Sequence, residues 1–163
     1  MSSSLSDRTH NFPEFFGDGI ENEVQLLQKI GFDSTMRYNQ GHIDGDYTAI
    51  LPDAVNEWEK LNAQHPIPHF PHISIGWDNN PRFKKFRPGV AENNTPENFE
   101  LALRKAKDYI DTHDLSAPLV TVNSWNEWTE TSYLEPDALN GYRYLEAVRN
   151  VFGLRMNVRQ ILG

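Results

Sequence analysis

Helix and strand patterns alternate along this chain, and the alternation limits the folds that it can adopt. The predicted helices cover residues 21–30, 53–61, 95–110 and 142–152, and the predicted strands cover residues 32–38, 72–77 and 118–123. Strands that alternate with helices pair in parallel, because each helix carries the chain back to the start of the next strand. The sequence therefore predicts an α/β fold, with one compact unit over residues 21–163 after an irregular segment, residues 1–20.

Glycine, proline and capping residues mark the ends of these predicted helices. Apolar residues recur at every third position over Val24–Ile30, and Gly31 can end that helix in a left-handed conformation. Pro52 suits the first turn of the helix over residues 53–61, because no helical hydrogen bond needs its missing N–H group there. The run Thr95–Glu97 predicts a helix start, since it combines a capping hydroxyl, a proline and an acid near the positive helix end.

Charge and composition exclude several classes of function. The formal net charge is −8, and the basic cluster Arg82, Lys84, Lys85 and Arg87 is too short to form the stripe that neutralises nucleic-acid phosphates. We therefore predict no nucleic-acid partner. The chain has no cysteine, which excludes disulfides, zinc–thiolate sites and cysteine nucleophiles.

The beginning of the chain carries no recognisable targeting signal. Residues 1–8 lack the apolar core of a signal peptide, and no apolar run approaches the roughly 20 residues that span a bilayer. As written, the sequence predicts a cytoplasmic protein without a membrane span. That expectation holds only if no further segment precedes Met1.

Polar and aromatic residues gather where the predicted strands end, which is where function collects in parallel α/β folds. The candidate site residues are Arg37 and Tyr38 after the first strand, Trp77, Asp78, Asn79 and Arg82 after the second, and Asn123, Trp125, Asn126, Glu127, Trp128 and Glu130 after the third. Structural loops more often carry Gly, Ser, Pro and Lys. The third strand end is therefore the strongest candidate for a site.

Glu127 and Glu130 could supply the two carboxyl groups that glycoside chemistry requires. In a continuing strand they would lie about 10 Å apart on opposite faces. A bend after Trp125 would aim both into one cleft, at the roughly 5 to 9 Å that such reactions use. Trp125 and Trp128 could then stack on sugar rings. Spacing alone leaves a second interpretation open, in which the tryptophans belong to the core and the glutamates to a solvated loop.

Three segments resemble the family 99-like glycoside hydrolases, which include endo-α-mannosidases and the WbsX-like proteins found with bacterial polysaccharide-biosynthesis genes. The similar segments are Val122–Glu130 followed by Tyr133–Asp137, Gly76–Arg82, and Gly141–Ala147. The resemblance implies the C-terminal part of a (β/α)₈ TIM barrel, with about three of its strand–helix units. The 163 residues fall short of the roughly 250 of a complete barrel. The family's first five strands have no counterpart here.

The resemblance also implies roles for individual residues. Glu127 would be the base that deprotonates a neighbouring sugar hydroxyl, and Glu130 the general acid/base at the glycosidic oxygen, with retention as the outcome. Tyr133 and Glu135 join the substrate-binding residues. The partner implied is a glycan or polysaccharide, with no cofactor. The first hypothesis is thus a glycoside-hydrolase-like protein, in truncated form.

Three other hypotheses stay open. The chain could be a non-catalytic carbohydrate-binding remnant, or a truncated product with no function of its own. It could also be a glycosyltransferase of polysaccharide biosynthesis, in which Asp44 and Asp46 form a D-x-D pattern for a divalent ion. Unpaired sheet edges would favour self-association in any of these cases.

Neither metal pattern in the sequence is strong, and we predict no metal site. Asp44-Gly45-Asp46 is also ordinary turn chemistry. His65, His69 and His72 are separated by prolines, which exclude the helical spacing of common metal sites.

Overall fold

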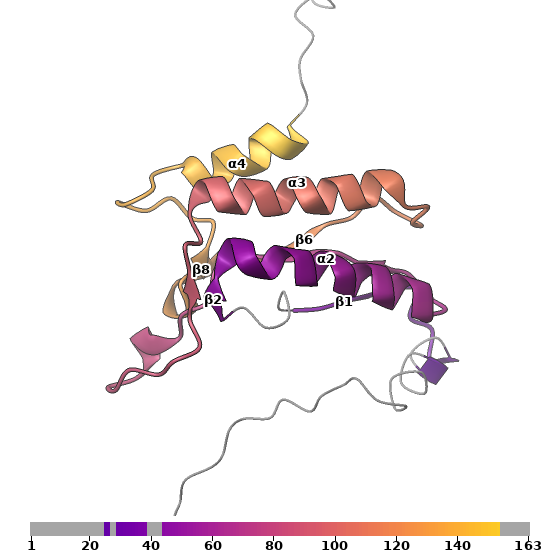
Figure 1. The fold of residues 1–163 in the computed structure, drawn as a ribbon, viewed down its shortest axis with the longest axis horizontal. Coiled ribbons are helices and arrows are strands. Elements are labelled where there is room, and N and C mark those ends of the chain that lie inside the picture. The colour runs from indigo at the N-terminus through magenta and orange to yellow at the C-terminus, as the bar shows by residue number, and fades with distance from the viewer. Residues whose placement is uncertain (1–24, 27–28, 39–43, 154–163) are drawn as a thin grey trace, which may run out of the picture.

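The computed structural model describes residues 25–26, 29–38 and 44–153 (Figure 1). The named helices are α2 (Tyr47–Gln64), α3 (Pro96–Thr112) and α4 (Arg143–Phe152), with the 3₁₀ turns η1 (Asn80–Arg82) and η2 (Trp128–Glu130). The strands are β1 (Thr35–Met36), β2 (Gly45–Asp46), β3 (His69–Phe70), β4 (His72–Ser74), β5 (Ala91–Glu92), β6 (Thr121–Asn123), β7 (Asn126–Glu127) and β8 (Ser132–Tyr133). Groups of two or three short strands therefore alternate with the helices, where the sequence predicted single strands.

Three of the four strand pairings in the described residues are parallel. β1 pairs with β3, β2 with β5, and β4 with β6, in which His72 lies opposite Thr121 and Ser74 opposite Asn123. β7 and β8 form an antiparallel pair directly after β6, which the sequence analysis missed. The parallel strand–helix units are confirmed. The pairings form separate two-stranded sheets, so the described residues show no closed barrel.

The core lies between the strands and the helices. In Figure 1, α2, α3 and α4 lie roughly side by side, and α3 contacts both of the others. Ile73 and Ile75 alternate along the segment that contains β4 and point into this core, where Phe99 and Leu103 of α3 are fully buried. Because strand side chains alternate between faces, His72 and Ser74 point to the opposite face. The apolar face of β4 therefore fixes which of its residues can face a site.

The start of α2 corrects the sequence prediction. The helix begins at Tyr47 rather than near Asp53, because the Asp46 carboxylate accepts hydrogen bonds from the backbone N–H groups of Thr48 (2.8 Å) and Ala49 (3.3 Å). Pro52 consequently lies inside the helix instead of in its first turn, and the placement predicted for it was wrong. A strong capping residue upstream outweighed the cost of one internal proline.

The other helices follow the predicted signals. Thr95 caps α3, with its hydroxyl accepting from the Asn98 N–H, and Pro96 occupies the first turn. α4 begins one residue after the predicted start, at Arg143, and ends just before Gly153. No helix in the described ranges is long and apolar enough to cross a membrane.

Part of the N-terminal prediction lies outside the described residues. This applies to the irregular segment 1–20 and to Val24 and Leu27 of the first predicted helix. Gln25, Leu26 and Lys29 are helical, and Gly31 has a φ of +95°, the left-handed conformation predicted for a helix end.

Candidate functional site

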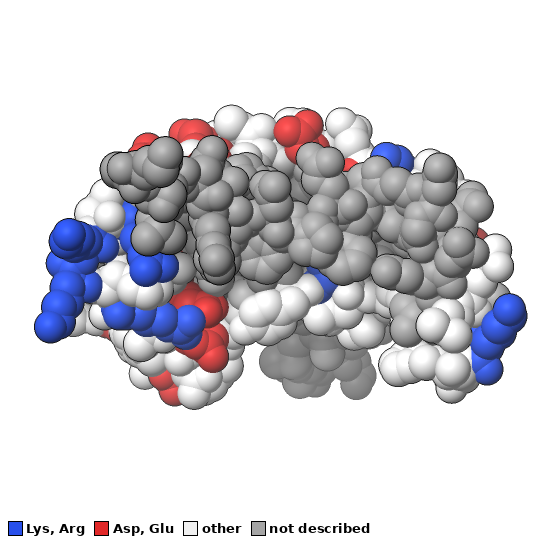
Figure 2. All heavy atoms as spheres, turned by 90° about the horizontal axis from the view of Figure 1, so that it is seen from below, with Lys and Arg blue, Asp and Glu red and all other residues white. Residues whose placement is uncertain are grey.

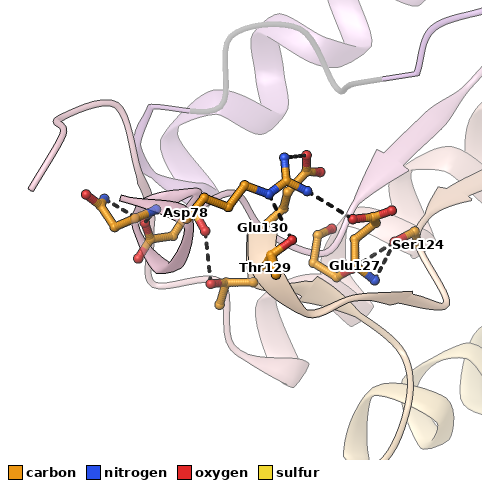
Figure 3. A network of polar contacts seen from close by, with 9 residues as sticks. Asp78, Ser124, Glu127, Thr129 and Glu130 are labelled. Atoms are coloured by element: carbon orange, nitrogen blue, oxygen red, sulfur yellow. Dashed lines mark hydrogen bonds and ion pairs between the residues drawn. The ribbon is translucent and has the colours of Figure 1, made fainter. Parts of the chain in front are cut away.

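The loops that follow β4 and β6 are hydrogen-bonded to each other (Figure 3). The Asp78 N–H donates to the Glu130 carbonyl at 2.8 Å, and the Thr131 hydroxyl donates to the Asp78 carbonyl at 3.1 Å. Thr131 has a φ of 53°, so the chain reverses sharply after η2. The 3₁₀ turn η2 separates Glu127 from Glu130, so the chain does not continue as an extended strand between them, and the reversal at Thr131 follows both glutamates.

Arg82 joins the two candidate carboxylates. Its Nη1 donates to Glu130 Oε1 at 2.8 Å, its Nη2 to Glu127 Oε2 at 3.3 Å, and its Nε to the Thr129 hydroxyl at 2.9 Å. Figure 3 shows Glu127, Thr129 and Glu130 close together, with their hydrogen bonds and ion pairs as dashed lines. The planar guanidinium can serve three acceptors at once, which an ammonium group could not do with the same geometry. The structure thus brings Arg82, Glu127 and Glu130 together.

The two carboxylates differ in their surroundings. The Glu127 side chain is 40% exposed and the Glu130 side chain 11% exposed. Glu130 Oε2 is buried and has no hydrogen-bond partner among the described residues. A buried acceptor without a donor is costly, and Glu130 bears that cost at this oxygen.

Two serines support the loop behind Glu127. The Ser124 hydroxyl accepts from the Glu127 N–H at 3.3 Å and donates to the Ser132 carbonyl at 2.9 Å. The Ser132 hydroxyl donates to the Asn123 carbonyl at 2.8 Å. These contacts hold the β7–β8 pair against the end of β6 and so fix the backbone that carries Glu127.

The tryptophans of the motif lie at the surface, which excludes the interpretation that they belong to the core. Trp125 is 54% exposed and Trp128 45% exposed. Trp128 stacks on Tyr133 with ring centroids 3.8 Å apart, and its Nε1 donates to Glu135 Oε2 at 2.6 Å. The stack and the hydrogen bond hold the Trp128 ring in one orientation. A fixed, exposed aromatic face is suited to contact a sugar ring.

Asn123 is the most deeply buried of the predicted site residues. It is 2% exposed, and neither its side-chain oxygen nor its nitrogen has a partner among the described residues. It lies at the end of β6, with its carbonyl accepting from the Ile75 N–H at 2.9 Å. Asn126 is exposed at the start of β7.

The candidate residues Trp77, Asp78 and Asn79 mainly determine the shape of the loop that follows β4. The Asp78 carboxylate accepts from the Asn80 N–H at 2.8 Å and from Asn80 Nδ2 at 2.7 Å, so it holds Asn80 rather than pairing with Arg82. Asn79 lies directly before η1. The Trp77 carbonyl accepts a hydrogen bond from the Ala91 N–H group at 2.7 Å. Asn79 and Trp77 are both half-buried at the base of the loop.

The two candidate residues after the first predicted strand, Arg37 and Tyr38, lie apart from the carboxylate contacts. Arg37 forms an ion pair with Glu57 of α2 at 2.7 Å, and Tyr38 is 59% exposed. Burial raises the pKa of Glu57, and the charge of Arg37 opposes that shift. The described contacts join neither residue to the Arg82 cluster.

His69 and His72 of the histidine pattern make structural contacts. His69 Nδ1 lies 3.0 Å from the Thr35 hydroxyl, and His72 Nδ1 lies 2.8 Å from the Thr121 hydroxyl. Burial lowers the pKa of each of these histidines to about 4. In the part of the chain that the structure describes, no group of three His, Asp or Glu residues could hold a metal ion.

Asp46, the second member of the D-x-D pattern, is already engaged. Besides capping α2, its Oδ2 accepts from Asn93 Nδ2 at 3.1 Å. Hydrogen bonds to its carboxyl group lower the pKa of that group, and the bond from the Thr48 hydroxyl has the largest effect. Its oxygens therefore stabilise the start of α2.

A cavity of about 400 Å³ adjoins the β7–β8 pair at the N-terminal ends of α3 and α4. Its lining includes Thr131 and Tyr133 next to the carboxylate cluster, together with Asn94, Asn140 and Arg143. The volume is within the range of small-ligand sites. Sequence reasoning named Tyr133 but missed this cavity, because its walls come from four separate segments.

Sequence reasoning also missed Ser124 and Thr129, which lie inside the motif and bond directly to Glu127 and Arg82. The available signal was a hydroxyl side chain directly before Trp125, at Ser124, and another between Trp128 and Glu130, at Thr129. The partners of those hydroxyl groups depend on the turn at η2.

Comparison with known proteins identifies the family. The family model described as Glycosyltransferase WbsX matches residues 8–148. The chain belongs to the WbsX family. This confirms the WbsX-like resemblance, and the family's description favours the glycosyltransferase hypothesis over the glycoside-hydrolase reading of the sequence.

Two curated relatives of this WbsX-family chain come from Xanthomonas campestris pv. campestris and are each named "Uncharacterized protein WxcX". The protein of strain B100 is 29% identical over 135 residues, covering 74% of this chain and 19% of the relative. The protein of strain ATCC 33913 is 29% identical over 138 residues, covering 80% and 19%. The chain thus spans about a fifth of the length of these relatives. No solved structure matches the chain.

Proposed function

We propose that this chain contributes the sugar-reacting site of a WbsX-family glycosyltransferase of polysaccharide biosynthesis. The observation that carries the proposal is the pair of carboxylates, Glu127 and Glu130, held by Arg82 at the ends of parallel strands. The family's description supports glycosyl transfer as the reaction class. A glycan is the acceptor that this family suggests.

The two carboxylates divide the proton transfers of the reaction. The more exposed Glu127 accepts the proton of the attacking sugar hydroxyl, while Glu130 donates a proton to the oxygen that leaves the anomeric carbon. One carbon–oxygen bond forms at that carbon and one breaks. Arg82 is a positioning residue, because it orients both carboxylates before the sugar arrives.

Aromatic rings and the neighbouring cavity bind the sugars. Trp125 and Trp128 present exposed ring faces, and the Trp128 face is fixed by Tyr133 and Glu135. The lining of the cavity of about 400 Å³ includes Thr131 and Tyr133, which follow Glu130 closely in the chain. The cavity is therefore the candidate site for a further sugar of the acceptor glycan.

Glycoside hydrolysis is the second candidate, and the carboxylate pair itself favours it. The same two groups would then act on a glycosidic bond, with water as the final acceptor. The two reactions share residues but differ in products. Transfer lengthens an acceptor by one sugar, whereas hydrolysis shortens a glycan and releases a new reducing end.

Mass spectrometry of the products distinguishes these functions. The chain, and a full-length WbsX-family protein that contains it, would be incubated with nucleotide sugars and oligosaccharide acceptors. We expect an acceptor heavier by one sugar residue, with loss of at least about 100-fold in rate for Glu127→Gln and for Glu130→Gln. Glu146→Gln, on the exposed side of α4, is the matched control and should keep full activity.

Other products would overturn the proposal. Shortened glycans without transfer would establish hydrolysis instead. Glycan binding that survives both glutamine substitutions, without any turnover in the full-length protein, would establish a carbohydrate-binding role.

A further inference from the structure

An exposed loop rich in basic and aromatic residues lies beside the carboxylate site. All residues over 81–88 are exposed, and we call Arg82–Arg87 the basic loop. In Figure 1 this segment follows β4 and projects away from the three helices, at the lower left. It is a protrusion of the molecule rather than a strip along a helix.

Asn80 closes the base of the basic loop. Its Oδ1 accepts from the Arg87 N–H at 2.6 Å, and its Nδ2 donates to the Arg87 carbonyl at 2.9 Å. Asp78 in turn holds Asn80. The two ends of the loop are thus fixed, and the intervening side chains are presented to solvent.

The charge of the basic loop is opposite to that of the chain. The loop holds four of the 15 Lys and Arg residues of a chain whose net charge is −8, and no acidic residue occurs between Asp78 and Glu92. Arg82 turns toward Glu127 and Glu130, whereas Lys84 and Lys85 have no ion-pair partner within the described ranges. Figure 2 shows Lys and Arg side chains gathered at the end of the molecule where the loop projects.

Two phenylalanines share the tip of the loop with these cations. Phe86 is 75% exposed and Phe83 38% exposed, with the Arg87 guanidinium 3.4 Å from the Phe83 ring centroid. A single exposed apolar residue is ordinary, but two rings interleaved with lysines on a closed loop form an amphipathic surface. The rings contribute nothing to the buried core, so the fold does not explain them.

We propose that the basic loop docks the protein onto the surface of an anionic lipid membrane. Lys84, Lys85 and Arg87 would be attracted to anionic headgroups, and the Phe83 and Phe86 rings would enter the boundary between headgroups and acyl chains. Charge alone would also attract a soluble acidic polysaccharide. The protruding Phe86 ring favours the membrane, because only the membrane offers it an apolar phase.

Docking would orient the carboxylate site. Arg82 belongs to the same loop and contacts both glutamates, so the site would lie next to the lipid surface. Lipid-linked molecules held there would be within reach. The docking itself does not depend on the proposed reaction, and it can be tested without a sugar substrate.

Sedimentation with lipid vesicles tests the proposal directly. The purified chain would be mixed with vesicles of phosphatidylcholine alone and of phosphatidylcholine with phosphatidylglycerol. We expect binding to the anionic vesicles and little to the neutral ones, with affinity falling as salt rises because the headgroup charges are screened.

Two variants separate the contributions of charge and ring. Lys84→Gln/Lys85→Gln should weaken binding to anionic vesicles by about tenfold or more. Phe86→Ser should weaken it as well, and mainly at high salt, where the charge attraction is screened. The matched control is Lys29→Gln/Lys105→Gln, which removes two exposed lysines far from the loop in sequence and should bind as the unaltered chain does.

Three outcomes would overturn the proposal. They are absence of binding to anionic vesicles, equal weakening by the control pair, and normal vesicle binding by Phe86→Ser at every salt concentration. Tight binding to soluble dextran sulfate without any vesicle binding would identify an acidic polysaccharide as the partner instead.

Discussion

Arg82 determines the arrangement of the candidate site at the scale of single residues. The side chain starts in η1 and reaches Glu127, Thr129 and Glu130, which lie more than 40 positions later in the chain. Glu130 is 8% exposed, so its charge depends on this partner for compensation. Two separate sequence segments contain the three charged residues, and only the contact between the two loops pairs them.

Arg82→Gln should therefore destabilise the chain and loosen the carboxylates. We expect a loss of about 1–3 kcal/mol in the free energy of unfolding, because the buried Glu130 would lose its charged partner. Urea denaturation, monitored by tryptophan fluorescence, measures this loss of free energy of unfolding. Arg104→Gln, which removes an exposed pair with Glu100 on α3, should cost no more than about 0.5 kcal/mol. Equal losses in the two variants would show that the Arg82 contacts are ordinary surface pairs.

At the scale of elements, one carboxylate decides where α2 begins. Asp46 caps the helix and also binds Asn93, so it ties the start of α2 to the segment after β5. The same residue was the second half of a D-x-D pattern in the sequence. A single side chain thus supports two hypotheses that experiment can separate.

Asp46→Ala should lower the melting temperature by about 2–4 °C through loss of the cap. Asp53→Ala, an exposed position within α2, should leave it unchanged. Circular dichroism on heating measures both. If Asp46 instead held a functional divalent ion, Mn²⁺ would raise the melting temperature of the unaltered chain and not that of Asp46→Ala.

At the scale of the whole molecule, buried neutral histidines link stability to pH. His69 and His72 lie next to each other along the β3–β4 segment, are 4% and 3% exposed, and have pKa values lowered to about 4 by burial. The unfolded chain binds protons on these residues near pH 6.5, whereas the folded chain does not. Their contribution is complete above pH 6.5 and is lost as the pH falls toward 4.

The free energy of unfolding should therefore drop between pH 6.5 and pH 4, by up to about 3 kcal/mol for each histidine. Denaturation at a series of pH values measures the slope. His72→Gln should have a shallower slope by about one proton. A slope that His72→Gln leaves unchanged would assign the acid sensitivity to the carboxylates.

The local chemistry of the sequence determined the elements of this protein. Thr95, Pro96 and Gly31 predicted their helix ends because caps and backbone preferences act over a few residues. The order of strands and helices predicted parallel pairing, and the motif from Asn123 to Glu130 predicted where polar groups collect. The start of α2 was missed because Asp46 was interpreted as a turn or metal residue, although its cap acts over only two to three residues.

Tertiary structure alone decided the environment of each side chain. Ser124 became a support of Glu127, Arg82 became the partner of two carboxylates, and Arg37 was directed to Glu57 instead. It also buried Glu130 while leaving Trp125 and Trp128 exposed, the reverse of what hydrophobicity alone suggests. These outcomes depend on contacts between segments distant in the chain. Local propensities carry no information about such contacts, which are fixed only when β4 and β6 pair and bring the two loops together.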